Sequence, residues 1–290
     1  MSIYQIPCNK NGCHHLNDIT KSVCGSCGLP LDGTINMRRA TIPSEITALD
    51  KRYNDATIFV QTQNLGSELK ALESEVINHG KAVINTNLDF LWQWLINQSA
   101  DYTSYRRQII NRSRPKALYE DDNRRVITDS ALFGSEIDII YAALSTDETG
   151  LNSYGGVTII LKTKSIESRT SALETNSYLF LDSARSNGWA LFQPLPAGFM
   201  AVWPDNFKLA AAKLAKSLKP GISGTEIARL ILTSTNDRKT DVFIELFVYG
   251  EIVSTVIEKI KIPSALKTSL NAKARLRLNE LEKKVKIDYY

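Results

Sequence analysis

All four cysteines of this 290-residue chain lie within its first 27 residues. They form two short-spaced pairs, Cys8 with Cys13 and Cys24 with Cys27, separated by ten residues. Two turns of this kind bring four thiolates into the tetrahedral arrangement that Zn²⁺ prefers. A segment this short cannot bury a sufficient hydrophobic core, so a bound metal would supply its stability. We therefore predict a structural zinc module over residues 1–32, ligated by these four cysteines.

The ligand set and the redox state of this segment leave alternatives open. Residues 22–31, SVCGSCGLPL, resemble the second knuckle of many zinc ribbons, but the first pair encloses four residues and is followed directly by His14. His14 or His15 could therefore replace one cysteine. The cysteines could also form two disulfides, but the N-terminus shows no secretory signal pattern, so we expect a cytoplasmic, reducing environment. Four protein ligands leave no open position, which favours a structural metal over a catalytic one.

The remainder of the chain is poor in residues for metal or thiol chemistry. His79 is the one histidine after residue 15, and no cysteine follows residue 27. No run approaches the ~18 apolar residues of a membrane helix, so we expect no membrane partner. The sequence also lacks the Walker, dinucleotide-binding, nucleophile-elbow and zinc-protease motifs. Chemistry in the body must then use carboxylates, hydroxyls, amides, lysines, arginines or His79, which we interpret as a helix-end residue.

Residues 33–124 are predicted to form a linker followed by a helical segment. The stretch after Leu31 has no clear periodicity and is typical of a linker. From Ser67, apolar residues recur at helical spacing as far as Leu95, with a possible stop at residues 78–80. Residues 105–116 carry five basic side chains and no acid, which indicates a helix whose arginines face solvent or bind phosphate.

Residues 125–290 are predicted to form a mixed α+β domain. Apolar, β-branched runs predict strands over residues 137–144, 157–161, 178–181, 198–203 and 241–249. Helices are expected over 207–218, after a capping box from Ser223 to Glu226, and as one amphipathic helix from Ser264 onwards. Because these strands do not alternate regularly with helices, a doubly wound parallel sheet is not expected.

The positive charge of the chain is concentrated near its C-terminal end. Residues 261–286 contain eight lysines and arginines against two glutamates, whereas the whole chain has a net charge of only +4. A solvated helix face accounts for this pattern, and so does contact with nucleic acid or another polyanion.

One acidic residue interrupts an apolar run. In residues 241–249, Glu245 would share one face of a strand with Phe243 and Phe247. A carboxylate on an apolar face is paired, at a sheet edge or functional. We predict that Glu245 lies on the wall of a pocket, with a pKa raised by desolvation.

Several blocks of the body resemble, in order, those of some bacterial ADP-ribosyltransferase-like domains. They comprise residues 141–162, 168–171, 174–177 and 243–250, and the resemblance covers about residues 125–263. In such domains a first strand lines the NAD site and a hydroxyl-bearing middle strand supports the nicotinamide ribose. A late strand presents the catalytic glutamate.

This resemblance implies a role for each matched residue. Glu245 would be the catalytic carboxylate, stabilising the oxocarbenium charge and orienting or deprotonating the nucleophile. Thr170 or Ser171 would position the ribose of NAD. Tyr141 or Tyr154 would stack on nicotinamide. The acceptor would be a protein or nucleic acid, with the zinc module used for targeting. The alternative is a non-enzymatic protein that binds nucleic acid or a protein partner through the zinc module and the basic C-terminal helix.

Overall fold

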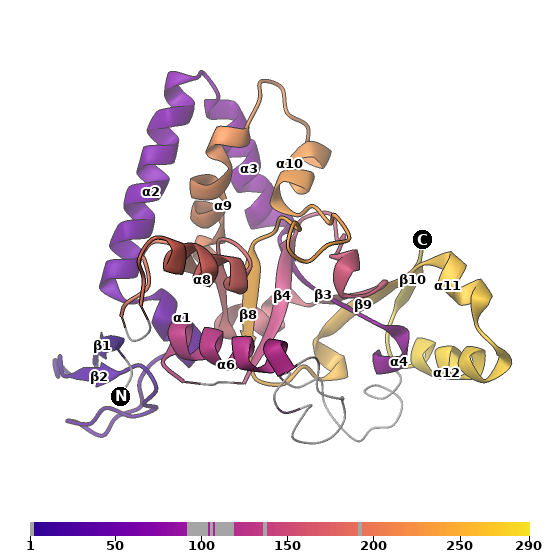
Figure 1. The fold of residues 1–290 in the computed structure, drawn as a ribbon, viewed down its shortest axis with the longest axis horizontal. Coiled ribbons are helices and arrows are strands. Elements are labelled where there is room, and N and C mark those ends of the chain that lie inside the picture. Colours follow the sequence, from indigo (N-terminus) through magenta and orange to yellow (C-terminus); the bar gives the residue numbers. More distant parts are fainter. Residues whose placement is uncertain (1–2, 92–103, 105–106, 108–118, 136–137, 191–192) are drawn as a thin grey trace.

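The computed structural model describes residues 3–91, 104, 107, 119–135, 138–190 and 193–290. Its largest element is a mixed eight-stranded sheet, which confirms the predicted α+β class (Figure 1). The strands are β3 (Lys81–Thr86), β4 (Ile139–Ser145), β5 (Val157–Leu161), β6 (Thr170–Leu173), β7 (Met200–Val202), β8 (Glu245–Tyr249), β9 (Ile257–Ile262) and β10 (Ile287–Tyr289). Their order is β10-β9-β5-β3-β4-β8-β6-β7, and only the β10–β9 pair is parallel.

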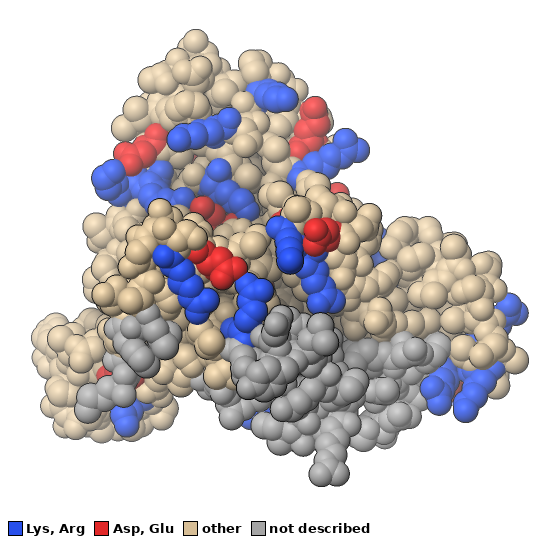
Figure 2. Space-filling model, viewed as in Figure 1, with Lys and Arg blue, Asp and Glu red and all other residues tan. Residues whose placement is uncertain are grey.

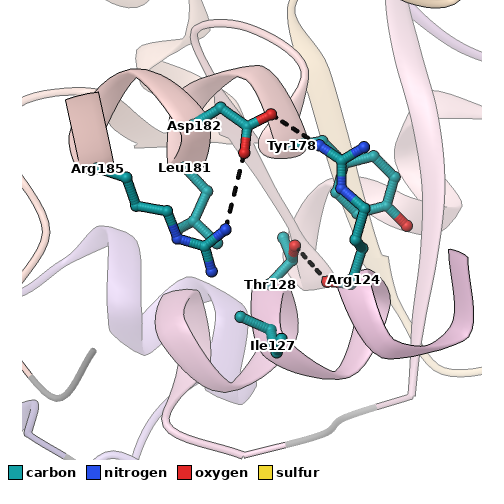
Figure 3. Close-up of a pocket in the computed structure, with 7 residues that line it drawn as sticks. All are labelled: Arg124, Ile127, Thr128, Tyr178, Leu181, Asp182 and Arg185. Atoms are coloured by element: carbon teal, nitrogen blue, oxygen red, sulfur yellow. Dashed lines mark hydrogen bonds and ion pairs between the residues drawn. The ribbon is translucent and has the colours of Figure 1, made fainter. Parts of the chain in front are cut away.

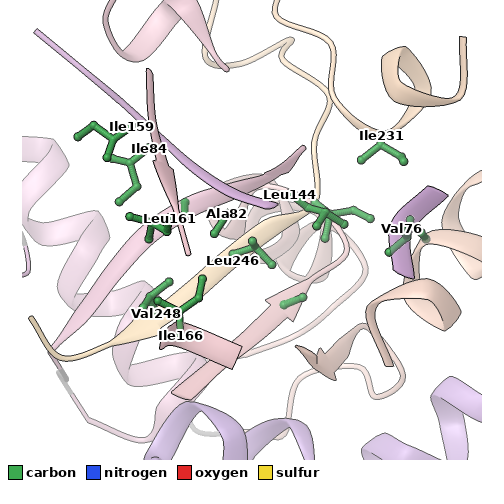
Figure 4. Packing of buried hydrophobic residues seen from close by; sticks show 14 of the residues in the cluster. Val76, Ala82, Ile84, Leu144, Ile159, Leu161, Ile166, Ile231, Leu246 and Val248 are labelled. Carbon is green, nitrogen blue, oxygen red and sulfur yellow. The ribbon is translucent and has the colours of Figure 1, made fainter. Parts of the chain in front are cut away.

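Four helices of the described residues cover one face of this sheet. They are α2 (Pro43–Thr62), α3 (Gly66–His79), α9 (Asn206–Leu214) and α10 (Gly224–Ile231). Val76 of α3 belongs to the same buried cluster as Leu144 and Leu246 of the sheet (Figure 4). Helix α10 begins with the predicted capping box, in which Ser223 and Glu226 each bond the other's backbone N–H.

In the described part of the chain, the opposite face is covered by three helices and the N-terminal module. They are α1 (Ile35–Ala40), α6 (Tyr119–Phe133), α8 (Ser177–Ser186) and the N-terminal module (residues 3–32), which contains the two-stranded sheet of β1 (Gln5–Pro7) and β2 (Leu16–Asp18). Buried side chains of the module, including Ile6 and Ile19, belong to the same hydrophobic cluster as Phe133 of α6 and Phe247 of β8. The module is therefore packed directly onto the body.

The remaining elements connect or extend this framework. They are α4 (Leu88–Leu91), α7 (Thr163–Ile166), α11 (Ser264–Ser269), α12 (Ala272–Glu282) and short 3-10 turns at Asn152–Tyr154, Glu167–Arg169, Trp203–Asp205, Ala215–Ser217 and Ser254–Val256. Helices α11 and α12 lie at the opposite end of the molecule from the N-terminal module in Figure 1. None of the helices among the described residues combines the length and apolar character needed to cross a bilayer.

The segment predicted as a linker and a long helix is different in the structure. Residues 35–40 and 43–62 are helical, so the expected linker is wrong over most of its length. Helix α3 ends at His79, within the stop predicted at residues 78–80, and residues 81–86 then form β3. Ala82, Val83 and Ile84 are all buried because β3 lies inside the sheet, and such a strand shows no alternating pattern. The sheet thus takes strands from both sides of residue 125.

Two further predictions are corrected. Residues 178–181, predicted as a strand, lie inside α8, because the Asn176 side chain caps the helix by accepting from the N–H groups of Tyr178 and Leu179. The single C-terminal helix expected from Ser264 is two helices, α11 and α12, and Asn271 caps the second. Of the basic segment at residues 105–116, all but Arg107 lies outside the described residues.

Candidate metal centre and candidate active site

The four cysteines converge in the N-terminal module. Their Sγ atoms all lie within 4.8 Å of one another, with Cys8 and Cys27 separated by 3.7 Å and Cys13 and Cys24 by 3.8 Å. Four sulfurs placed tetrahedrally at ~2.3 Å from a zinc ion lie ~3.8 Å apart. None of the four is in a disulfide, and neither His14 nor His15 belongs to the group. This group of four can therefore hold a metal ion.

Local backbone geometry favours the thiolate at Cys24. Gly28 adopts a positive φ of 72° and donates to the Cys24 carbonyl at 3.0 Å, which closes the second knuckle. Hydrogen bonds from the Cys27 and Ser26 backbone N–H groups, and then from the Asn17 side chain, lower the pKa of Cys24 to about 6. The Cys24 sulfur is thus held in an environment that favours the thiolate, which is the form that binds metal.

The N-terminal module is tied to the body by polar contacts around Tyr4. The Tyr4 hydroxyl donates to the Ala131 carbonyl of α6 at 3.1 Å and accepts from the Leu195 N–H at 3.2 Å. The guanidinium of Arg39 lies 4.1 Å from the centroid of the Tyr4 ring. Arg39 also forms a buried ion pair with Glu45 at 2.7 Å. These contacts join the module to α1, α2, α6 and the segment before β7.

Glu245 lies at the start of an interior strand of the sheet, not on an edge strand. It is the first residue of β8, which lies between β4 and β6, and its side chain is 5% exposed. Its Oε2 accepts from the Ser177 N–H at 2.7 Å, so the carboxylate pairs with the N-terminal turn of α8. Burial raises the pKa of Glu245 to about 7, although the Arg125 charge and the Ser177 N–H oppose the shift.

The structure brings Tyr141 and Tyr154 close to Glu245. Both phenols are half-buried, and the Glu245 carboxylate contributes to raising the pKa of each, after burial itself. The Tyr141 hydroxyl donates to the Asp129 carboxylate, and the Tyr154 hydroxyl accepts from Asn176 Nδ2 at 3.3 Å. Three residues that the sequence assigned to one site therefore share one polar cluster.

Thr170 and Ser171 are not brought to the Glu245 carboxylate. Thr170 pairs with Val248 and so faces the other side of the sheet, where its fully buried hydroxyl donates to the Ile166 carbonyl at 2.7 Å. Ser171 shares the face of Glu245, but it is fully buried opposite Phe247 and bonds Asn36 Nδ2 at 3.2 Å. Both hydroxyls are engaged in holding the interior together.

The cluster around Glu245 also contains residues that the sequence reasoning missed. Arg125 and Asp129 are one turn apart on α6, and Tyr178 lies in the first turn of α8. The Arg125 guanidinium carbon lies 3.5 Å from the centroid of the Tyr141 ring and 4.8 Å from that of Tyr178. The i, i+4 spacing of Arg125 and Asp129 was the one signal in the sequence that they share a helix face.

A small pocket lies beside this cluster, between α6 and α8 (Figure 3). Arg124 of α6 reaches across it to Asp182 of α8 at 2.7 Å, and Arg185, on the same helix as Asp182, lies 3.7 Å from that carboxylate. Tyr178 forms part of the pocket wall. Basic and acidic side chains are interspersed over the middle of the same face of the molecule (Figure 2). Glu245 is not among the residues that line this pocket.

Some basic side chains of the C-terminal segment contact acidic and carbonyl groups of the same segment. Lys267, Lys283 and Lys286 pair with Glu282, Glu280 and Asp288 at 3.4, 2.6 and 3.6 Å. Arg275 donates to the carbonyls of Leu270 and Thr268. Residues 261–290 nevertheless keep a net positive charge, because eight lysines and arginines face three carboxylates.

No protein-family model matches this chain, and a search of curated proteins gives no match. The resemblance to ADP-ribosyltransferase-like domains stays a prediction.

Proposed function

We propose that the chain is an NAD-consuming enzyme of the ADP-ribosyl-transfer type, with a structural zinc ion in its N-terminal module. The observation that carries this proposal is Glu245, a carboxylate buried on an interior strand of the sheet beside Tyr141 and Tyr154. Ionisable groups with strongly shifted pKa values cluster at functional sites. The four convergent thiols support the zinc.

The proposed chemistry uses the Glu245 carboxylate in two steps. As the bond between the ribose carbon and the nicotinamide nitrogen breaks, its electron pair leaves with nicotinamide and positive charge develops on the ribose. The ionised carboxylate stabilises that charge, and burial strengthens the interaction. An acceptor hydroxyl or water then attacks the same carbon, and its proton passes to Glu245. With a pKa of about 7, this carboxyl group can both hold and release a proton near neutral pH.

The neighbouring residues have supporting roles in this proposal. One face of each tyrosine ring is covered by a guanidinium, Arg125 over Tyr141 at 3.5 Å and Arg238 over Tyr154 at 4.6 Å. Nicotinamide would therefore stack on the opposite face of Tyr141 or Tyr154. The Ser177 N–H fixes the orientation of the Glu245 carboxylate. Thr170 and Ser171 are given no contact with the ribose, since their hydroxyls are buried and bonded elsewhere. The acceptor of the ADP-ribosyl group in this proposal is a protein or a nucleic acid.

Nicotinamide release from NAD tests this proposal. Wild-type protein is expected to release nicotinamide, and Glu245→Gln to slow release by roughly 10²–10³-fold, because Gln keeps the size of the side chain but loses its charge. Glu251→Gln is the matched control, since Glu251 is an exposed glutamate just beyond the other end of β8 that pairs with Arg107 at 3.2 Å. No release by wild-type protein with protein, RNA and DNA acceptors, or equal rates in both variants, would contradict the proposal.

The alternative is a binding protein that grips a polyanion through its C-terminal helix. The observation that favours it is the charge of residues 261–290, which hold eight lysines and arginines against three carboxylates. If this alternative holds, charge reversal at Arg275 and Arg277 should weaken the affinity for nucleic acid. The affinity that remains should depend less on salt concentration.

A further inference from the structure

Asn85 of β3 is a polar residue on the face of the sheet that carries Glu245. The register places Val83 opposite Ala143 and Ala143 opposite Glu245, so these three side chains share one face. Because side chains alternate along a strand, Asn85, two residues after Val83, lies on the same face. A half-buried amide is thus placed on the side of the sheet that holds the Glu245 cluster.

The Asn85 amide binds the turn that connects β4 to β5. Its Oδ1 accepts from the Leu151 N–H at 2.8 Å, and its Nδ2 donates to the Gly155 carbonyl at 3.1 Å. Nδ2 also donates to Thr158 Oγ1 at 3.2 Å, on the neighbouring strand. One side chain therefore bonds both ends of the stretch from Leu151 to Gly155, across 66 and 70 residues of sequence.

The shape of this turn is matched to β3. A Cβ added at Gly150 would lie 2.1 Å from Asn85 Oδ1, so a larger residue there would displace the amide. At Gly155, where φ is +142°, a Cβ would lie 2.3 Å from the Thr86 carbonyl oxygen. Leu151 is buried against the sheet. The turn is therefore seated directly on the strand, with glycine at both points of closest approach.

Tyr154 is the residue that this turn carries to the Glu245 cluster. Its ring packs against the buried cluster that contains Val83 and Phe243, and its hydroxyl accepts from Asn176 Nδ2 at 3.3 Å. Those contacts hold the side chain of Tyr154, whereas Asn85 holds the backbone on both sides of it.

The loop before β8 also reaches the turn. The Asn152 N–H donates to Ser234 Oγ at 3.0 Å, and Arg238 Nε donates to the Ser153 carbonyl at 3.1 Å. Both of these hydrogen bonds are exposed to solvent, whereas those of Asn85 are partly buried. Loss of the Asn85 bonds should therefore cost more, because water replaces an exposed partner more readily than a buried one.

We propose that Asn85 is a positioning residue of the Glu245 site, which seats the turn on the sheet and thereby sets the place of the Tyr154 ring relative to the Glu245 carboxylate. With the turn fixed in advance, the ring does not have to be ordered when a ligand binds. This inference deepens the proposed function and rests on it only for the identity of the ligand that Tyr154 contacts.

The position of Tyr154 can be measured without a ligand by ¹⁹F NMR of protein labelled with 3-fluorotyrosine. Its resonance is identified as the one that disappears in Tyr154→Phe. In Asn85→Ala this resonance should move to the position of a solvent-exposed tyrosine. Asn85→Asp, which keeps the size of the side chain, should have the same effect, because a carboxylate cannot donate to the Gly155 carbonyl.

Gly155→Ala is a second route to the same result, because it forces the turn away from the Thr86 backbone while Asn85 is retained. Asn271→Ala is the matched control. It also removes an amide side chain that bonds a backbone group, the Ala274 N–H at 2.9 Å, but it does so on α12. Circular dichroism establishes that each variant is folded, and Asn85→Asp and Gly155→Ala keep the test decisive if Asn85→Ala is not. An unmoved Tyr154 resonance in the folded Asn85 variants, or an equal movement in Asn271→Ala, would overturn the inference.

Nicotinamide release supplies a second measurement. In Asn85→Asp the KM for NAD should rise about 2- to 10-fold, which is the worth of one aromatic contact, and kcat should change less because Glu245 is retained. Movement of the Tyr154 resonance with KM and kcat both unchanged would show that the ring has no part in the site and would overturn the inference.

The outcomes separate this inference from the proposed function. Movement of Tyr154 in the Asn85 variants of a protein that releases no nicotinamide would support the positioning role and contradict the enzyme. Nicotinamide release together with an unmoved Tyr154 resonance in those variants would do the reverse.

Discussion

At the scale of single residues, Glu245 and Ser177 show how a carboxylate is kept in the interior of a sheet. Removal of an ionised carboxylate from water is expensive, and one backbone N–H at 2.7 Å offsets only part of that cost. The group responds by binding its proton more tightly, so that its pKa rises to about 7. The folded chain therefore carries an internal acid that titrates near neutrality.

This shift predicts a pH-dependent effect of Glu245→Gln on stability. The folded protein holds the Glu245 proton up to about pH 7, whereas the unfolded chain releases it near the ordinary value of 4.5. Wild-type stability should therefore fall as pH rises between these values, and the glutamine variant should escape that loss. Relative to wild type, the variant should gain up to roughly 3 kcal/mol between pH 4 and pH 8.

Urea unfolding of both proteins at several pH values measures this difference. Glu251→Gln, whose side chain is exposed, should show no comparable trend. A stability difference between Glu245→Gln and wild type that stays constant from pH 4 to pH 8 would contradict the burial of an ionisable group at this position.

Residue types in the sequence indicated part of this site. Glu245 could be identified because an acidic residue within an apolar run is recognisable in the sequence alone. The four cysteines could be identified from their spacing. Arg125 did not, because its partners, Tyr141 and Tyr178, come from a strand and a helix that lie close only after folding. Asn36 is a second example, since it bonds the Phe247 carbonyl at 2.8 Å across 211 residues.

At the scale of elements, α8 links capping to the candidate active site. Asn176 caps this helix through the N–H groups of Tyr178 and Leu179, and its amide also donates to Tyr154. The same helix end supplies the Ser177 N–H to Glu245. Two consecutive residues, Asn176 and Ser177, therefore position the helix cap, the Tyr154 ring and the Glu245 carboxylate.

Asn176→Ala should lower the free energy of unfolding by about 1 kcal/mol, as the loss of a helix cap usually does. It should also weaken NAD or ADP binding, because Tyr154 loses its hydrogen-bond donor. Asn271→Ala removes the equivalent cap from α12, where the Asn271 side chain accepts from the Ala274 N–H at 2.9 Å. This control should cost similar stability in urea unfolding and leave ligand affinity unchanged; equal losses of affinity in both variants would count against the role of α8.

Elements with local signals were predicted better than those defined by distant contacts. The capping box at Ser223 and Glu226 involves only neighbours in sequence, so α10 was found. Residues 178–181 have the composition of a strand, yet the cap at Asn176 and packing on α6 make them helical. β3 was missed because central strands are apolar on both faces, and that pattern also fits a buried helix.

At the scale of the whole molecule, the N-terminal module behaves as part of the core. Cys8 and Cys24 belong to the same buried cluster as Phe133, Leu173 and Phe247. If a flexible linker separated the module from the body, the body would stay folded without the metal. The helices α1 and α2 instead occupy most of the segment between them. Stability of the module and stability of the sheet are therefore expected to be coupled.

We predict that loss of the metal destabilises the whole chain. Purified protein should contain about one zinc per chain, and Cys27→Ser or chelation should remove it. The melting temperature should then fall by roughly 5 °C or more in one shared transition, because the buried cluster loses part of its packing. Hydrogen exchange within residues 124–133 should accelerate as well. An unchanged melting transition of the body after metal removal would show that the two cores are independent.

The topology of the sheet has a consequence for synthesis on the ribosome. The cysteines can gather once 27 residues have emerged, but Phe247, which the module packs against, follows 220 residues later. At the usual ~5–20 residues per second, this interval lasts roughly 10–45 s. Strand β3 is also synthesised before both of its neighbours in the sheet, β4 and β5, and stays unpaired until they emerge. During vectorial synthesis, the nascent chain must therefore carry an apolar module face and an unpaired central strand, both of which are natural targets for chaperones.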